Sequence, residues 1–329
     1  TNSGGLNRMV YDGDPEKQPV FIRYGHNPAD KRTLSKGAIL ALHEDNRRNL
    51  WIGIENGGLD ILPFMDIEEG EPMFHHHISF PTDENTLSGN SIHTIYRDRH
   101  ETMWLGQYTS GVDFFNERFN RFIHHKYIPG VSNCLNNNSV NTIMEVGHEL
   151  YLGTEGGLNI LDQRTGKYRH FVSDPNDPYS LGSNAIWSMH ADSKGNLWLG
   201  TWEGGLNLFD PEKGTFTRYM NDPGDPHSLG SNSVYGIVED KEGNLWIACM
   251  GGGLNKYDYT TQTFERFQVD FNRNSISNNW VVTLMESSLG EIWLVTTTAV
   301  DIFNKATGKF TSFTHDNNNP GSIGYNTAI

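Results

Sequence analysis

The sequence has few cysteines and no long apolar run. Its 329 residues include two cysteines, Cys134 and Cys249, which fit neither a CxxC motif nor a metal-ligand spacing. We therefore expect two free, packed thiols instead of a disulfide framework. The longest apolar runs, such as Trp280-Val281-Val282, end within a few residues. Because a bilayer-spanning helix needs roughly 20 apolar residues, no membrane insertion is expected of this chain.

Basic residues are also scarce. Lysine and arginine number 25 against 40 aspartates and glutamates, which gives a formal net charge of −15. Such a surface repels phosphate backbones and anionic lipids, so nucleic acid is not expected as a partner. The first five residues lack the basic and apolar stretches of a signal peptide, as a mature or excised segment also would.

Turn formers and rings, in contrast, are abundant. The chain contains 35 glycines and 12 % aromatic residues, whereas only 36 % of its residues are hydrophobic. This mixture is typical of many short strands joined by turns. A helical bundle is not expected.

One segment repeats along the whole chain. The run NLWLGTWEGGLNLFD, from Asn196 to Asp210, returns with little change. The aromatic residue that anchors it recurs at intervals of 53, 47, 47, 48 and 47 residues, at Trp51, Trp104, Tyr151, Trp198, Trp246 and Trp293. Such a period suits four short strands and their turns.

Each repeat predicts the same four strands. The first has two apolar residues three apart around a small residue, as expected where neighbouring sheets converge. The second is the Leu-Trp-Ile-Gly strand, buried on both faces, and the third follows a Gly-Gly-Leu turn. The fourth, outermost strand begins with a ring, two residues and usually another ring, at Phe21/Tyr24, Phe74/His77, Phe119/Phe122, Tyr168/Phe171, Phe216/Tyr219, Phe264/Phe267 and Phe310/Phe313.

Four antiparallel strands repeated radially predict an all-β fold, a seven-bladed β-propeller in one domain over residues 1–329. The seventh blade is split between the ends, residues 1–24 and 316–329, and lacks its Leu-Trp-Ile-Gly strand, so we expect the natural protein to continue. The complete blades are predicted at residues 25–80, 81–127, 128–173, 174–221, 222–269 and 270–315.

These repeats resemble the two-component regulator propeller repeat. The signature is Asn-Leu-Trp-(Ile/Leu)-Gly-Thr, then Gly-Gly-Leu-Asn and (Phe/Tyr)-Asp, preceded by Ser-Leu-(x)-Ser-Asn-(x)-Val. Its best copies run from Ser180 to Asp210 and from Ser228 to Asp258. Departures such as Tyr151 for Trp and Ala248-Cys249 for Gly-Thr weaken individual repeats but keep the strand pattern.

The resemblance implies a function. In that family such propellers form the periplasmic sensor of hybrid two-component histidine kinases in glycan-degrading bacteria. The family usually has a second propeller, a small β-sandwich, a membrane helix and a cytoplasmic kinase in the same parent chain, and the full receptor can act as a homodimer. An oligosaccharide ligand, and through the kinase an effect on transcription, are what the resemblance implies; any phosphotransfer belongs to segments outside this sequence.

Two positions vary among otherwise constant repeats and are therefore candidates for recognition. One lies in the loop between the second and third strands: Glu55, Tyr108, Glu155, Trp202, Met250 and Thr297. The other follows the first apolar residue of the first strand: Leu40, His93, Asn141, Trp187, Tyr235 and Val282, with Trp280 nearby.

Aromatic rings beside amides and carboxylates suit a sugar, because rings stack on its C–H face while Asn and Glu bond its hydroxyls. The predicted ligand-binding residues are Trp202, Glu203, Trp187, Tyr235, Tyr108, Glu155, Asn184, Asn232 and Trp280. Plainer readings stay open: Trp187 and Tyr235 as packing between blades, the asparagines as turn formers that bond their own backbone, and the glutamates as solvated residues.

Other functions also stay open. Paired carboxylates could hydrolyse a glycosidic bond, so a glycan- or lactone-acting propeller enzyme is an alternative, as is a protein-docking scaffold. No catalytic residue, cofactor or metal site is predicted. The histidines of His75-His76-His77 and His124-His125 alternate between strand faces and are expected to have a surface role. His76 and His170 take the place of Arg23, Arg121, Arg218 and Arg266 in other outer strands.

Overall fold

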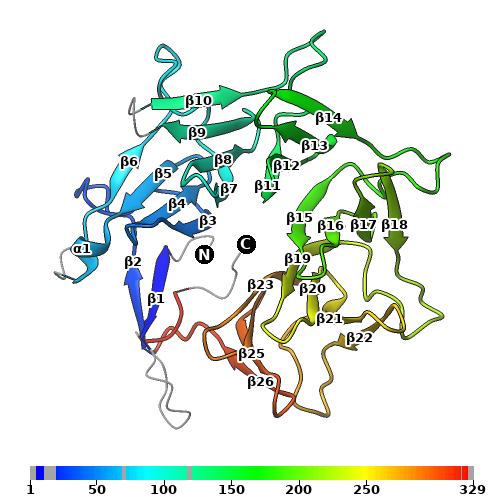
Figure 1. Ribbon diagram of the computed structural model, residues 1–329. Helices are drawn as coiled ribbons and strands as arrows, with labels where there is room; N and C mark the ends of the chain where they lie inside the picture. Colours follow the sequence, from blue (N-terminus) through cyan, green and yellow to red (C-terminus); the bar gives the residue numbers. More distant parts are fainter. Residues whose placement is uncertain (1–4, 11–19, 69–71, 117–120, 320, 325–329) are drawn as a thin grey trace. The chain divides into compact units, whose positions relative to one another are not determined.

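The structure is a computed structural model that describes residues 5–10, 20–68, 72–116, 121–319 and 321–324 (Figure 1). In these ranges the chain forms six four-stranded antiparallel sheets, one two-stranded sheet and the five-residue helix α1 (Phe64–Glu68). No helix in the described ranges has the length and apolar character needed to cross a membrane. Each four-stranded sheet falls inside one of the six predicted repeats, which confirms the four-strand assignment.

The described residues group into two compact units, with the boundary inside strand β11. The first unit includes residues up to Ile143 and the segment from Thr314 onward, and the second extends from Met144 to Phe313. Whether the chain is one domain of seven blades stays a prediction. The first unit contains β1 (Leu6–Val10), β2 (Val20–Tyr24), β3 (Ile39–Glu44), β4 (Leu50–Ile54), β5 (Gly58–Leu62), β6 (His75–His77), β7 (Ile92–Arg97), β8 (Met103–Gln107), β9 (Val112–Asn116) and β10 (Arg121–His125).

The second unit contains the remaining sheets. β11 (Val140–Val146), which carries the boundary, is joined in sheet order to β12 (Glu149–Thr154), β13 (Gly157–Asp162) and β14 (Lys167–Phe171). The other strands are β15 (Ile186–Ala191), β16 (Leu197–Thr201), β17 (Leu206–Asp210), β18 (Thr215–Tyr219), β19 (Val234–Glu239), β20 (Leu245–Cys249), β21 (Gly253–Asp258), β22 (Thr263–Phe267), β23 (Val281–Glu286), β24 (Ile292–Thr296), β25 (Val300–Asn304) and β26 (Lys309–Phe313).

In the second unit the sheets approach one another at their first strands, so that β15 contacts β19 and β19 contacts β23 (Figure 1). There is no room for a side chain at Gly236 of the first strand β19, or at Gly200 of β16, the second strand beside β15. A Cβ atom on Gly200 would lie 2.5 Å from Val234 Cγ1, and one on Gly236 would lie 2.5 Å from Leu284 Cδ2. The predicted convergence at small residues is confirmed here, because real Cβ contacts are longer than these distances.

The tryptophan strands form the core of each unit. Trp198 is 1 % exposed and packs with Val234, Leu245 and Tyr257 of the following sheet. In the first unit, Trp51 packs in the same way in a cluster that includes residues of β7 and β8. Since burying such rings removes a large apolar area from water, each sheet is held mainly by its neighbour in the same unit.

The outer strand of the second repeat corrects one prediction. β10 pairs Phe122 with Phe115 and His125 with Val112, as β18 pairs Phe216 with Phe209 and Tyr219 with Leu206. The ring pair of this strand is therefore Phe122/His125, and the predicted pair Phe119/Phe122 is wrong by three residues. The ring-x-x-ring spacing occurs twice in this stretch, and hairpin pairing, not ring spacing, decides the register. Phe119 itself lies outside the described residues.

Two histidines of the outer strands donate hydrogen bonds to buried aspartates. His124, not Arg121, occupies the position of Arg218, and it lies opposite the fully buried Asp113. The His124 Nδ1–H group donates to Asp113 at 2.6 Å, and His76 donates to the buried Asp60 at the same distance. His76 is exposed and His124 is partly buried, which agrees with a surface role for His76, but each histidine also donates to a carboxylate that is itself fully buried.

The cysteines and the chain ends were also predicted. Cys134 and Cys249 are buried thiols that form no disulfide within the described residues, as expected. β1 and β2 lie where the third and fourth strands of the split blade were predicted. The predicted start of its first strand, residues 326–329, lies outside the described residues.

Candidate functional site

The variable position in the first strand is a β-bulge. In five sheets the pairing of the first and second strands skips one residue, so that, for example, Ile186 pairs with Thr201 and Ser188 with Gly200. A bulge leaves one residue outside the ladder and turns its side chain to a new direction. The skipped residues are those singled out in the sequence: Leu40, His93, Trp187, Tyr235 and Val282.

The variable loop position is fixed by a backbone hydrogen bond. Trp202 N–H donates to Ala185 O at 2.9 Å, and Tyr108 N–H donates to Ser91 O at 2.9 Å. Glu55, Met250 and Thr297 make the corresponding bond. Because the backbone satisfies itself in the same way each time, the side chain at this position is not needed for the fold. The loop residue and the bulge residue of one sheet lie at the same end of its strands.

Three of the predicted residues meet in the second unit, and we call Trp187, Tyr235 and Trp202 the aromatic cluster. The rings of Trp187 and Tyr235 stack with centroids 5.0 Å apart and an angle of 14° between their planes. Trp202 meets Tyr235 edge-on at 5.9 Å and 63°. Trp202 is 39 % exposed, whereas Trp187 and Tyr235 are half-buried. The cluster thus combines one exposed ring, that of Trp202, with the two stacked, half-buried rings of Trp187 and Tyr235.

The cluster also carries polar hydrogens. Burial raises the pKa of Tyr235 to about 12, so its hydroxyl stays neutral near pH 7 and can donate a hydrogen bond. The Trp187 Nε1–H group is buried and has no hydrogen-bond partner among the described residues. A surface with ring faces and a neutral hydroxyl suits an uncharged polar ligand better than an ion.

The corresponding positions behave differently in the first unit. There Tyr108, which is 46 % exposed, stacks on His93 of the same sheet at 4.9 Å and 26°. In this sheet the ring of the loop residue Tyr108 contacts the ring of the bulge residue His93. In the second unit, by contrast, both Trp202 and Trp187 contact Tyr235 of the next sheet. Tyr108 belongs to the first unit, whereas the aromatic cluster belongs to the second.

The remaining predicted residues occupy separate places. Trp280 is 52 % exposed and forms a backbone bridge with Met250 of the neighbouring loop. Glu203 is exposed beside Trp202 and has φ of 56°, a conformation that favours glycine or asparagine. Glu155 is exposed in its own loop.

Asn184 and Asn232 are explained by the fold. The Asn184 Oδ1 atom accepts from Ser173 N–H, and the Asn232 Oδ1 atom accepts from Asn221 N–H, both at 2.7 Å. Asn90, Asn138 and Asn279 make the same bond in other sheets. A bond that recurs in five sheets belongs to the framework, so a structural role accounts for both residues, although the backbone group that each bonds lies eleven residues earlier and not in its own turn.

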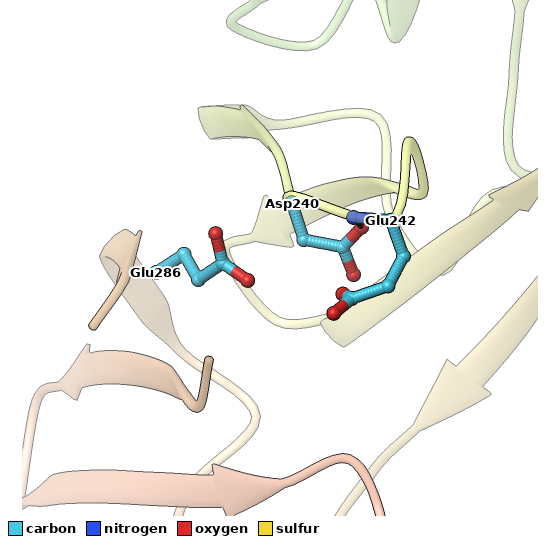
Figure 2. A group of neighbouring side chains, drawn as sticks. All are labelled: Asp240, Glu242 and Glu286. Carbon is cyan, nitrogen blue, oxygen red and sulfur yellow. Dashed lines mark hydrogen bonds between the residues drawn. The ribbon is translucent and has the colours of Figure 1, made fainter. Parts of the chain in front are cut away.

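Sequence reasoning missed a second polar constellation at the opposite ends of the strands. Asp240, Glu242 and Glu286 converge there, as Figure 2 shows. Lys305 lies among them, 3.1 Å from Asp240 and 2.8 Å from Glu286, and it also contacts Glu242. Its ammonium group supplies the positive charge that three carboxylates need.

A buried hydrogen bond underlies that constellation. Burial alone would raise the pKa of Asp240, but hydrogen bonds from Trp246, Asn244 and Lys305 outweigh it and hold the pKa at about 2. The Asp240 carboxylate accepts from Trp246 Nε1–H at 2.8 Å. The sequence does contain a pattern that indicates this hydrogen bond. An aspartate lies six residues before the anchor tryptophan in four repeats: Asp45/Trp51, Asp98/Trp104, Asp192/Trp198 and Asp240/Trp246.

Larger hollows in the second unit lie elsewhere. A groove of about 750 Å³ runs along β21 and β22, and one of about 600 Å³ lies beside Trp246 and Lys305. Neither is lined by a predicted site residue. Both are open grooves along hairpins.

The comparisons with known proteins agree with the repeats. The sequence model of the two component regulator propeller matches residues 180–203 and 228–251. Over these two spans the sequence is similar to the two component regulator propeller repeat. These two spans contain all three residues of the aromatic cluster. No curated protein matches the chain.

Solved structures show the fold. The chain is similar to the extracellular domain of a protein described as the hybrid two component system BT3049 from B. thetaiotaomicron, with 21 % identity and a TM-score of 0.72, over 89 % of this chain and 37 % of that one. It is also similar to the WD40 β-propeller domain of Doa1, with 12 % identity and a TM-score of 0.62, over 97 % and 88 % of the two chains. Virginiamycin B lyase from Staphylococcus aureus matches at 10 % identity and a TM-score of 0.62, over 85 % and 86 %. The fold is therefore that of β-propellers.

Proposed function

We propose that this chain is the extracellular ligand-sensing domain of a hybrid two-component receptor and that it recognises an oligosaccharide through the aromatic cluster. The match of two repeats to the two component regulator propeller supports the receptor assignment. The likeness to an extracellular domain of such a system, of which this chain spans 37 %, supports it further. The full receptor would then hold this domain in the periplasm, beside a second propeller and a β-sandwich.

The aromatic cluster is the observation that carries the ligand class. An exposed indole held by a fixed backbone offers a flat apolar face to the C–H groups of a pyranose or furanose. The Tyr235 hydroxyl and the exposed Glu203 carboxylate offer a donor and an acceptor for hydroxyl groups near that face. No charged side chain is required to neutralise a neutral sugar.

Signalling needs a difference in affinity between two receptor states. An oligosaccharide that binds one arrangement of propellers, or one arrangement of a receptor homodimer, more tightly shifts the population toward it. The kinase elsewhere in the parent chain would then respond to that arrangement. This domain contributes recognition and rigidity, and no chemical step.

The test is calorimetric titration of the purified chain with a panel of plant and host oligosaccharides, with product analysis of the same mixtures. We expect binding without product. Trp202→Ala should abolish that binding, and Tyr179→Ala should not, because Tyr179 is a 65 % exposed ring outside the cluster. Turnover of any oligosaccharide would favour an enzyme instead, and binding that survives Trp202→Ala would remove the cluster from the site.

A further inference from the structure

Trp280 occupies a position that the other repeats fill with a small residue. It directly precedes the first apolar residue of the first strand, where the other complete sheets have Ala38, Ser91, Ser139, Ala185 and Ser233. The carbonyl oxygen at this position accepts from the loop residue of the same sheet. Thr297 N–H donates to Trp280 O at 3.2 Å, as the loop residue Trp202 does to its own sheet. The fold therefore uses the backbone here and does not require an indole.

The side chain at this position is directed toward the loop of the preceding sheet. Ser233, for example, accepts through Oγ from the Glu203 N–H group of the preceding loop at 3.4 Å. Trp280 lies against the corresponding loop of the sheet β19–β22, because it forms a backbone bridge with Met250. The next loop residue is Gly251, where an added Cβ atom would have no neighbour within 4 Å. The Trp280 ring, which is 52 % exposed, thus lies beside a loop with open space around it.

The sheet β19–β22 connects this indole to the aromatic cluster. Its bulge residue Tyr235 contacts Trp202 of the preceding sheet, and its loop residue Met250 pairs with Trp280 before the following one. Met250 N–H donates at 2.9 Å to the carbonyl oxygen of Ser233, two residues before Tyr235, so both contacts lie at the same end of the sheet. Two exposed indoles of the second unit therefore flank the loop end of one sheet.

The spacing of these indoles limits the ligands that can use both. Each indole offers a flat apolar face on which the C–H groups of one sugar unit can stack. Neighbouring sheets pack roughly 10 Å apart, and the sheet β19–β22 lies between the two rings. One sugar unit therefore cannot cover both rings, whereas a chain of several units can.

We propose that Trp280 is a second stacking site and that the ligand is a linear neutral oligosaccharide that lies across the loop end of the sheet β19–β22. One unit would stack on Trp202 and a later unit on Trp280. This inference rests on the proposed function and adds the length and shape of the ligand. A long chain gains the second contact without a second loss of translational and rotational freedom, so it binds more tightly than a short one.

The test is calorimetric titration of the chain with matched short and long oligosaccharides. Cellobiose is paired with cellohexaose and xylobiose with xylohexaose, and each other oligosaccharide of the panel is paired in the same way. For the sugar that binds, we expect the long member to bind about fivefold to tenfold more tightly than the short one, which is the contribution of one aromatic contact. Equal affinity of the two members would overturn the second stacking site.

Two variants locate the gain. Trp280→Ser installs the residue that three other sheets have at this position, so the backbone can accommodate it. It should remove the gain in affinity with length and leave the melting temperature nearly unchanged. Phe271→Ser, which removes a 98 % exposed ring from the preceding loop, should keep the gain. A gain that survives in Trp280→Ser would overturn the proposal, as would a clear fall in its melting temperature, because the fold would then need the ring.

Indole N–H signals in nuclear magnetic resonance spectra separate this inference from the proposed function. The long oligosaccharide should shift the signals of both Trp202 and Trp280, and the short one should shift that of Trp202. A shift at Trp202 without one at Trp280 in the long complex would overturn only the second stacking site. Absence of binding by every oligosaccharide, or binding that survives Trp202→Ala, would instead overturn the proposed function and this inference with it.

Discussion

The two ends of the β15–β16 strand pair differ in which groups complete the hydrogen bonds: side chains at one end and the backbone at the other. At the turn end, the Asp192 carboxylate accepts from Trp198 Nε1–H at 2.8 Å, from Asn196 at 2.8 Å and from the Tyr259 hydroxyl at 2.9 Å; Asp192 and Trp198 are buried, and Asn196 and Tyr259 are partly buried. At the other end, the bulge residue Trp187 and the loop residue Trp202 have a backbone that satisfies itself.

This difference indicates which positions of a repeat can vary in sequence. Where a buried side chain completes the hydrogen bonds of its neighbours, replacing it leaves donors or acceptors unsatisfied, so the same residue recurs from sheet to sheet. Where the backbone completes its own bonds, the side chain is free to differ. The four predictions below test this contrast through the free energy of unfolding, from the largest effect to the smallest.

Among the four test substitutions, control variants apart, Asp192→Ala should be the most damaging. It removes the acceptor of the buried Trp198 indole N–H and of the partly buried Asn196 amide and Tyr259 hydroxyl, and we expect a loss of about 3 kcal/mol. Urea denaturation followed by tryptophan fluorescence measures it. Asp174→Ala, in an exposed loop, is the control and should cost far less. Equal losses in the two variants would break the comparison.

Lys305→Met should come next, with a loss of about 2 kcal/mol near neutral pH, because it leaves Asp240, Glu242 and Glu286 without their cation. The direction in which this stability loss changes with pH follows from the pKa of Asp240. The carboxylate of Asp240 has a pKa lowered to about 2, so the stability that it contributes is present above its ordinary pKa and lost as the pH falls toward 2. The variant should therefore differ least from the wild type in acid. Denaturation at several pH values would refute this if the difference grew on acidification.

His124→Gln should have a smaller, pH-dependent effect. The hydrogen bond to Asp113, opposed by burial, raises the pKa of His124 above its ordinary value. A raised pKa means that the contribution is complete below the unfolded pKa and fades as the pH rises through the folded one. The variant should thus lose more stability at about pH 5.5 than at about pH 8.5. A loss independent of pH would show that His124 acts only as a neutral donor.

Trp202→Ala should have the smallest effect on unfolding, below about 1 kcal/mol, because the ring is 39 % exposed and its main contact is the edge of Tyr235. Its matched comparison is Trp198→Ala, a buried ring of the same kind, which we expect to cost about 3–5 kcal/mol. Melting temperatures of the two variants would settle the contrast. Similar losses would mean that Trp202 belongs to the core.

Much of the fold was predictable because it depends on local, repeated patterns. The anchor tryptophans, the glycine turns and the small residues of the first strands each report a backbone or packing requirement that recurs in every sheet. The outer strand of the second repeat was not predictable, since two ring spacings compete there and only pairing with β9 chooses Phe122/His125.

The candidate site was predictable in part. Variation among constant repeats singled out Trp187, Tyr235 and Trp202, and the structure brings these three rings together. The same reasoning selected Asn184 and Asn232, whose loop hydrogen bonds a sequence does not display. It overlooked Lys305, because its three carboxylate partners come from other strands and turns far along the chain.

The sequence by itself determined the period, the four strands of each repeat and the residues that are free to differ, because all of these follow from spacing and side-chain polarity along one strand. Only the tertiary structure decided the bulges at Trp187 and Tyr235 and the pairing of buried Asp113 with His124. These depend on hydrogen bonds between strands, and such bonds are fixed by register and by neighbouring segments rather than by local preference.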